Sequence, residues 1–435
     1  MAVGSLGVEA NSRPWRPGRH LALLGGTTTA ADCQVALRHL VRPNTMIEGA
    51  AIADYEQAFA DRIETRFAIS FAAGRIGLFG ILRSLGIGHG DEVLLPVPTH
   101  IVVANAIRYT GAKPVYVDCE LDTFNIDLVH AASRVTPRTK ALILQHGFGI
   151  PVDLDRASEF ARSGLVLIED CVHALGSTYQ QRPVGTFGRA AFFSTEETKT
   201  ISTTMGGVVV TDDPELACSL RAYQEACSWP SRRLVARYLA KLLVYYGLAQ
   251  PHLHRPIRVV YERIGHRHPL PRPTTSGELR GLKPAAYEQR LSNAQAAVGL
   301  EQLRRLDANL AHRRTISERY RARLSERGVA VPRPPEGSDP AFVRYPVLVK
   351  DRAAAERAVA PKAVLGTWFT SVLEEALSPS YGDYIQGSCP RAEVAARHLV
   401  NLPTHPRVTN EDANAIVDAL LDSPSKPVAA ASDLV

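Results

Sequence analysis

Residues 165–199 read LVLIEDCVHALGSTYQQRPVGTFGRAAFFSTEETK, and this stretch decides the fold. Its two apolar runs, LVLIED and AAFFST, have the length and composition of buried β-strands. Asp170 therefore ends one strand on the side where α/β sheets bind their ligands. Lys199 follows the end of the second run, at Ser194, by five residues in a polar loop. Taken alone, such an aspartate is more often a helix cap or surface acid, and such a lysine is more often solvated.

Apolar runs of the same kind lie on both sides of this stretch. They are VLLPV (93–97), PVYVD (114–118), ALILQH (141–146) and GVVVT (207–211). Helical patterns separate most of the runs, which is typical of βαβ units and predicts an α/β fold on a largely parallel sheet. The runs between 165 and 211 follow one another more closely, so we expect a local β-rich insertion there.

A small turn, Ala73-Gly74-Arg75, opens a helical pattern and can hold a phosphate through backbone N–H groups. A phosphate turn, a strand-end Asp170, and then Ser194 and Lys199 are together what pyridoxal phosphate (PLP) requires. The lysine forms a Schiff base with the aldehyde, and the aspartate keeps the pyridine nitrogen protonated so that the ring accepts electrons. The combination therefore predicts a PLP enzyme.

The sequence resembles the DegT–StrS family of sugar aminotransferases, which are fold-type I PLP enzymes. The resemblance covers about residues 45–225 and 285–421. Outside residues 165–199 it rests on LGIGHGDEVLLPVPTH (85–100), GAKPVYVDCELDTFNID (111–127), TPRTKALILQHGFGIPVDLD (136–155), MGGVVVTDD (205–213), QRLSNAQAAVGLEQL (289–303) and LPTHPRVTNEDANAIVDAL (402–420). It implies an α/β/α large domain with a mainly parallel mixed sheet, a smaller C-terminal α+β domain, and a homodimer with active sites at the interface.

The resemblance also assigns roles to single residues. Lys199 matches the lysine that carries PLP and shuttles the proton, and Asp170 matches the acid on the pyridine nitrogen. Ser194 matches the phosphate-binding serine, and His173 the side chain beside the cofactor ring. His100 falls where the family has an aromatic ring stacked on the cofactor; the alternative is a hydrogen-bonded histidine at a helix start.

The sequence departs from the family pattern at three places. The phosphate turn lacks its usual hydroxyl, so Arg75 either supplies a guanidinium to the phosphate or points away. The stretch that reaches a neighbouring subunit's site reads Glu288-Gln289-Arg290, where only Arg290 matches. Glu196 and Glu197 stand where aromatic and proline residues are usual, and two acids suit a cationic or amino-bearing substrate unless they point away.

We expect four parts along the chain. They are a flexible arm (1–20), a large PLP-binding domain (21–310), a small domain (311–422) and a disordered tail (423–435). Residues 292–320, which run from the large domain into the small one, predict one long helix.

Residues 230–282 form a linker or insertion longer than the family's usual one. Its stretch Ser231–Tyr246 predicts a basic amphipathic helix. Three interpretations stay open: a dimer or active-site lid, packing within one subunit, or an interfacial helix that touches anionic lipid.

Composition excludes several classes of protein. The chain has 435 residues, 45% of them hydrophobic and 22% charged, which suits a folded protein of two or three domains. We see neither a membrane span nor a secretory signal. Six cysteines without a CxxC pair favour free thiols in the cytoplasm and no metal site. A net charge of +6 spread along the chain argues against nucleic-acid binding, and the excess of arginine among the 50 cations we attribute to genomic base composition.

These observations predict an aminotransferase that moves an amino group, with glutamate as donor, to a keto group. The expected acceptor is a nucleotide-activated sugar or a cyclitol, in bacterial sugar or secondary-metabolite biosynthesis. One alternative is another PLP reaction on a non-sugar substrate, such as elimination or decarboxylation. A PLP-dependent sugar dehydratase is a second, although relatives of that type lack the lysine, and a non-catalytic homologue is a third.

Overall fold

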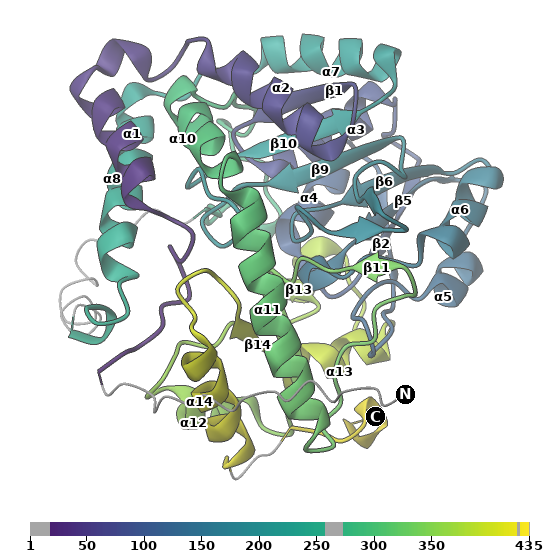
Figure 1. Cartoon of the computed structure of the whole chain (residues 1–435). Helices are drawn as coiled ribbons and strands as arrows, with labels where there is room; N and C mark the ends of the chain where they lie inside the picture. Colours follow the sequence, from purple (N-terminus) through teal and green to yellow (C-terminus); the bar gives the residue numbers. More distant parts are fainter. Residues whose placement is uncertain (1–17, 257–272, 424–426, 435) are drawn as a thin grey trace, which may run out of the picture.

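A seven-stranded sheet forms the centre of the molecule (Figure 1). The computed structural model describes residues 18–256, 273–423 and 427–434. The strand order is β1-β10-β9-β6-β5-β2-β4, and among these strands only β10 runs against the others. The predicted mainly parallel mixed sheet is thus confirmed. The strands are β1 Phe67–Phe71, β2 Glu92–Pro96, β4 Lys113–Val117, β5 Thr139–Gln145, β6 Val166–Asp170, β9 Ala190–Ser194 and β10 Gly207–Thr211.

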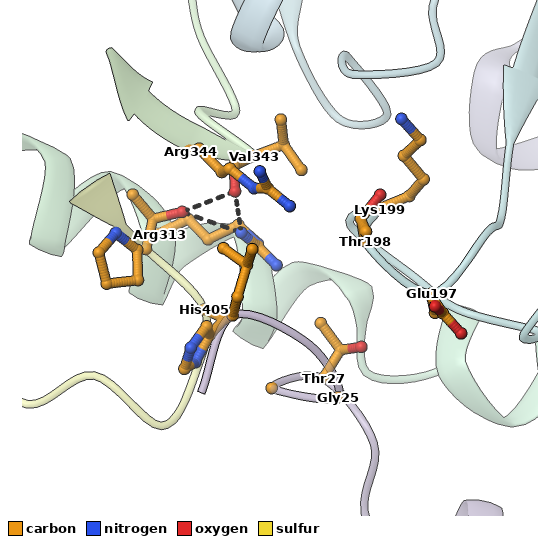
Figure 2. Close-up of a pocket in the computed structure, with 13 residues that line it drawn as sticks. Gly25, Thr27, Glu197, Thr198, Lys199, Arg313, Val343, Arg344 and His405 are labelled. Atoms are coloured by element: carbon orange, nitrogen blue, oxygen red, sulfur yellow. Dashed lines mark hydrogen bonds between the residues drawn. The ribbon is translucent and has the colours of Figure 1, made fainter. Parts of the chain in front are cut away.

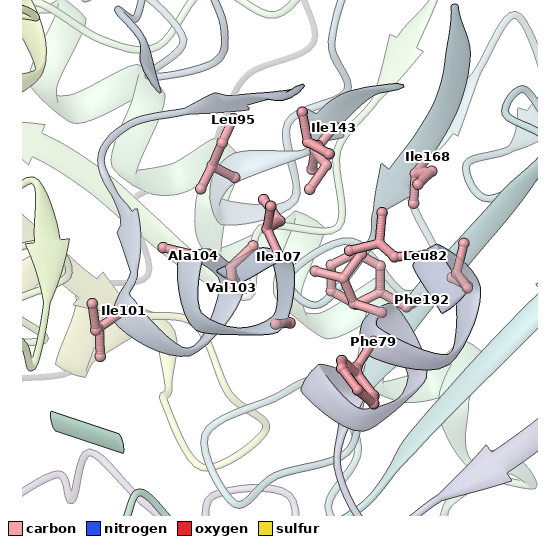
Figure 3. Packing of buried hydrophobic residues seen from close by; sticks show 14 of the residues in the cluster. Phe79, Leu82, Leu95, Ile101, Val103, Ala104, Ile107, Ile143, Ile168 and Phe192 are labelled. Atoms are coloured by element: carbon pink, nitrogen blue, oxygen red, sulfur yellow. The ribbon is translucent and has the colours of Figure 1, made fainter. Parts of the chain in front are cut away.

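Helices cover both faces of this sheet, which is why its strands are apolar on both sides. Leu95, Ile143 and Ile168 face the helices α3 (Gly74–Ser84) and α4 (Ile101–Tyr109), as Figure 3 shows. Leu94 and Leu142, one residue away in sequence, join the core on the other face. Helices α2 (Ala51–Ile63), α5 (Leu128–Ser133) and α6 (Leu154–Arg162) pack on that second face, and α7 (Pro214–Ala226) packs on the first.

The β-rich insertion lies between β6 and β9. Strands β7 (Thr178–Tyr179) and β8 (Arg182–Pro183) form a hairpin there. Strand β11 (Ser338–Asp339) comes from far along the chain and completes a three-stranded sheet.

The expected long helix at 292–320 is two helices, α10 (Asn293–Leu303) and α11 (Leu306–Ser325). The break falls at Arg305, whose backbone leaves helical geometry with φ −108° and ψ 6°. Its guanidinium there pairs with the buried carboxylate of Asp32 at 2.8 Å, in α1 (Ala30–Val41). The prediction of a single helix was wrong because periodicity alone does not detect such a change of direction.

A second core surrounds the short antiparallel pair β12 (Arg344–Leu348) and β14 (Leu399–Pro403). Helices α12 (Arg352–Val359) and α14 (Asn410–Leu421) and the C-terminal half of α11 pack around it, while α13 (Pro390–His398) contributes to the large core. Leu21 also belongs to this second core. Helix α11 spans both cores: Leu306 and Leu310 pack in the large one, and Ile316, Tyr320 and Leu324 pack in the second. The domain boundaries stay predictions.

The predicted disordered tail differs from the structure over residues 427–434. Val428 is buried, and its N–H donates to the Leu348 carbonyl at 3.1 Å. Residues 1–17 of the expected arm, 257–272 of the insertion, and 424–426 and 435 of the tail lie outside the described residues.

The predicted basic helix is α8 (Arg232–Leu248). Its residues Val235, Leu239 and Leu242 are buried against α1 and α10 (Figure 1). This contact is packing within one subunit, the second of the three interpretations. Among the helices of the described segments, none combines the length and the apolar character needed to span a bilayer.

Candidate active site

A cavity of about 290 Å³ opens at the carboxyl ends of β6 and β9 and at the first turns of α3 and α4. Parallel strands place their ligands at this edge. The predicted residues that line it are Gly74, Arg75, His100, Ser194, Glu196, Glu197 and Lys199. Asp170 and His173 do not line the cavity and are buried, whereas Val172, which lies between them in the sequence, lines it. Positions far apart in the sequence thus meet at one cavity.

Asp170 is the last residue of β6 and is almost fully buried. Its Oδ1 accepts a hydrogen bond from the Val172 N–H at 3.1 Å, whereas Oδ2 has no partner among the described residues. Burial raises the pKa of Asp170 to about 6, opposed by the Val172 N–H and by the charge of Lys199. A buried carboxylate oxygen without a donor is costly, so the site is suited to a ligand that supplies one.

Lys199 stands in the loop between β9 and β10. Three amide side chains of α10 and α11 form hydrogen bonds to the backbone of this loop. Gln302 accepts a hydrogen bond from the Ser202 N–H. Asn309 donates to the Thr200 carbonyl, and Gln295 donates to the Met205 carbonyl. The Lys199 Nζ lies 4.2 Å from the centroid of the Trp368 ring. Burial lowers the pKa of Lys199 to about 8, although the Glu196 carboxylate opposes the shift.

His173 stacks on Trp368, with ring centroids 4.4 Å apart and planes 13° apart. Its Nδ1 accepts a hydrogen bond from the Phe148 N–H at 3.3 Å. Burial lowers the pKa of His173 well below its usual value, and the nearby charges of Lys199 and Arg344 add to this. The ring is therefore neutral near pH 7 and carries its proton on Nε2.

The glycine turn forms a close-fitting cradle. Helix α3 begins at Gly74, and its N-cap Ala73 provides no side-chain cap. A Cβ at Gly74 would lie 3.0 Å from the Phe193 carbonyl oxygen and 3.5 Å from the Cβ of Ser194. A side chain at Gly74 would therefore crowd the backbone of β9. The helix start and Ser194 line the same cavity. This arrangement suits a phosphate.

Arg75 lines the cavity, but its guanidinium is engaged within the chain. It pairs with the buried Glu278 at 2.6 Å and donates to the Pro273 carbonyl at 3.0 Å. A contact from Arg75 to a phosphate therefore remains a prediction.

His100 is the N-cap of α4, where its Nδ1 accepts from the Val102 N–H at 3.2 Å. Its Nε2 lies 3.2 Å from the Glu375 carboxylate. This hydrogen bond lowers the pKa of Glu375 to about 2. His100 is thus a hydrogen-bonded histidine at a helix start, which was the alternative interpretation. Its stacking on a cofactor ring remains a prediction.

The two acids before Lys199 are both bonded within the chain. Glu196 accepts from the N–H and the hydroxyl of Thr198. Glu197 pairs with Lys241 of α8 at 2.6 Å, and both side chains are buried. The negative charge of Glu197 is therefore balanced from the amphipathic helix.

Arg290 does not line the cavity of its own chain. It donates to the carbonyls of Glu225 and Cys227 and stacks over Trp229, with its Cζ 4.6 Å from the ring centroid. Within one chain, Arg290 is therefore not placed to contact a substrate in this cavity, and its predicted role toward a substrate remains a prediction.

Sequence reasoning missed Trp368 and Arg344. Both come from the C-terminal part, and the Arg344 Cζ lies 3.7 Å from the Trp368 ring centroid. Trp368 lies in no recognisable sequence motif, and nothing in the sequence distinguishes Arg344 from the many other arginines. Leu24, before α1, was also missed as a lining residue.

The fold and the site together define an enzyme of the PLP-dependent aminotransferase class. A model of the DegT/DnrJ/EryC1/StrS aminotransferase family matches residues 28–421, and the chain belongs to this family. It is 31% identical over 378 residues to GDP-perosamine synthase of Caulobacter vibrioides, covering 86% of this chain and 90% of that one. It is 29% identical to dTDP-3-amino-3,4,6-trideoxy-alpha-D-glucose transaminase of Streptomyces venezuelae, covering 90% and 91%. The crystal structure of S. venezuelae DesV superposes with a TM-score of 0.70 at 27% identity, covering 93% and 98%.

Two observations of this structure fit PLP, the cofactor of this family. The free Oδ2 of Asp170 can accept a hydrogen bond from a protonated pyridine nitrogen, and the cradle at Gly74 and Ser194 can receive a phosphate. Lys199 lines the same cavity as Gly74 and Ser194 and can bond the aldehyde.

Proposed function

We propose that this enzyme transfers an amino group from an amino acid, glutamate in our assignment, to a keto group of a nucleotide-activated sugar or cyclitol. The observation that carries the proposal is that Lys199 and the Gly74 cradle line one cavity, while the buried Asp170, with its free Oδ2, is close enough to feel the charge of Lys199. The sugar is supported by relatives along nearly the whole chain that are named for GDP-linked and dTDP-linked amino sugars.

The residues of the site divide the work. PLP, when bound, supplies an electron sink that makes an amino acid's α-proton removable. Lys199 moves that proton, because a pKa of about 8 leaves both amine and ammonium accessible near neutral pH. Asp170 keeps a positive charge on the ring nitrogen, and neutral His173 orients the ring without adding charge. Trp368, stacked on the buried His173, forms part of the cavity wall.

In the sequence, the two acids near Lys199, Glu196 and Glu197, were an argument for a cationic substrate that is not a sugar. The ion pair of Glu197 with Lys241 and the bonds from Thr198 to Glu196 weaken that argument, because both charges are already engaged. The sugar or cyclitol acceptor is therefore favoured over the non-sugar alternative.

We also propose that the enzyme works as a cytoplasmic homodimer. Its six cysteine thiols are unpaired, which suits a reducing compartment. Arg290 faces away from its own cavity, in keeping with a role toward a neighbouring subunit.

The test is an absorbance spectrum of the protein with PLP, comparing wild type with Lys199→Ala. We expect a visible band in wild type that is absent in Lys199→Ala, because only the lysine amine can bond the aldehyde. L-glutamate should convert the band to that of the pyridoxamine form. Lys140→Ala, which changes an exposed lysine of β5, should behave like wild type.

GDP- and dTDP-linked keto-sugars should then restore the original band. A band that responds to glutamate but to no keto-sugar or keto-cyclitol would contradict the proposed acceptor. A band that ignores every amino acid would contradict aminotransfer itself.

A further inference from the structure

Arg344 is a buried cation without a protein anion. Its side chain begins at the first residue of β12, and the residue is 4% exposed. Its guanidinium stacks over Trp368 but forms no hydrogen bond or ion pair with another described residue. Burial lowers the pKa of Arg344 to about 10, so the group stays charged near pH 7. A buried charge without a partner is strongly unfavourable, so Arg344 is placed for a negatively charged ligand.

A second buried arginine lies beside it. Arg313 of α11 is 2% exposed and is fixed by hydrogen bonds to Asn309, the Val343 carbonyl and Thr404 at 2.8–2.9 Å. All these partners are neutral, and its pKa is lowered to about 9 by burial and by the charge of Arg344. Two guanidinium groups therefore share one region, and no carboxylate in the described part of the chain is bound to either.

Both guanidinium groups face a small cavity of about 20 Å³ opposite Lys199 (Figure 2). The Arg344 Cζ and the Lys199 Nζ lie 3.7 and 4.2 Å from the same Trp368 ring centroid, so their separation cannot exceed the sum of those distances. An amino acid whose nitrogen stands at Lys199 can reach Arg344 with a carboxylate. The volume admits one or two oxygen atoms and excludes a diphosphate.

The acidic groups that face Arg344 do not neutralise it. Glu196 and Glu374 are the carboxylates that act on it through space, and neither lies within ion-pair distance. Glu196 is bonded to Thr198, and Glu374 to the N–H and hydroxyl of Thr370. Glu197 lines the small cavity but pairs with Lys241.

We propose that Arg344, supported by the fixed charge of Arg313, binds a carboxylate of the amino donor. This inference rests on the proposed function and names the subsite, next to Lys199, through which the enzyme selects its amino donor. A planar guanidinium matches a carboxylate with two parallel hydrogen bonds, which a lysine cannot provide. Its stacking on Trp368 fixes the plane of that pair.

The experiment uses the enzyme with PLP bound and measures, by rapid-mixing absorbance, how the amino-donor half of the reaction depends on L-glutamate concentration. For Arg344→Met we expect the apparent Kd to rise by about 30-fold or more, because a desolvated charge pair is lost. The Kd of Arg344→Lys should fall between those of Arg344→Met and wild type, since the lysine keeps the charge but cannot donate the two parallel hydrogen bonds of a guanidinium. Arg314→Met removes the adjacent arginine of α11, which pairs with Asp339 outside the cavity, and should leave the Kd unchanged. The PLP band itself verifies that each variant is folded and loaded.

The outcomes separate this proposal from the function on which it rests. If wild type responds to L-glutamate and Arg344→Met responds with the same Kd, the subsite is overturned and aminotransfer stands. If wild type ignores every amino acid, both are overturned. If inorganic phosphate or chloride raises the melting temperature of wild type but not of Arg344→Met, while their Kd values for L-glutamate agree, the cavity binds an inorganic ion and the proposal is overturned.

Discussion

At the scale of single residues, the carboxylate of Asp170 is kept where its charge is costly. Burial is the main cause of its raised pKa, and its free Oδ2 has no donor from the protein. The same environment that destabilises the charge makes it a strong partner for a protonated ring nitrogen, because little water screens the pair. Function and stability therefore oppose each other at this position.

Asp170→Asn should stabilise the cofactor-free protein while it abolishes aminotransfer. The unfolded pKa is near 3.8 and the folded one about 6, so the charged form is penalised above about pH 6. We expect a gain of about 3 kcal/mol in unfolding free energy at pH 7. The gain should shrink as pH falls from 6 to 3.8 and vanish below, where both states are protonated.

Urea unfolding across this pH range measures the effect. The matched control is Asp54→Asn on the exposed side of α2, which should show no comparable dependence. A stabilisation that does not change with pH would contradict the burial argument.

At the scale of elements, α8 supports the loop that carries Lys199. Lys241 reaches from this helix to Glu197, and the Tyr245 hydroxyl lies 3.4 Å from the same carboxylate. Helices α10 and α11 hold the other end of the loop through Gln302 and Asn309. Helix α8, which lies in the segment that the sequence marks as an insertion, thus supports a loop that lines the cavity.

Lys241→Met should destabilise the protein by about 3 kcal/mol, because it leaves the buried carboxylate of Glu197 unpaired. The double variant Lys241→Met with Glu197→Gln should recover most of this loss, since no buried charge remains. Thermal unfolding and PLP titration of the variants test the coupling. Arg237→Met, an exposed position of α8, is the control. A double variant no more stable than the single one would show that the ion pair is not the cause.

At the scale of the whole molecule, the two cores are joined by residues that end up beside the site. Trp368 belongs to the C-terminal part, yet its ring contacts His173 and Lys199 of the large domain. Arg344, from the same part, stacks on Trp368. The last segment of the chain adds to this junction. Val428 packs in the large core, and the Ala330 N–H donates to its carbonyl at 2.9 Å.

Val428→Ala should therefore lower the unfolding free energy by about 2 kcal/mol, through lost burial and the cavity left behind. Val41→Ala serves as the control, because Val41 is 75% exposed and should change stability little. Urea unfolding compares the two. Equal effects would mean that the tail contributes no packing.

The sequence was most informative where neighbouring residues act together. The strand runs and the order of Gly74, Asp170, Ser194 and Lys199 are local patterns, so they predicted the sheet, the cofactor and the edge where it binds. The break at Arg305 could not be predicted in this way. It depends on Asp32, which lies far away in the sequence and close only in the fold.

The sequence by itself thus determined the α/β class, the family resemblance and a set of candidate cofactor-binding residues, because hydrophobic periodicity and strand ends are properties of short segments. Only the tertiary structure decided which distant side chains complete the site. The ring of Trp368, the unpaired charge of Arg344 and the partner of Glu197 are set by packing between the two cores and α8. Such contacts leave no pattern in one sequence, since burial and charge pairing are settled only when remote segments meet.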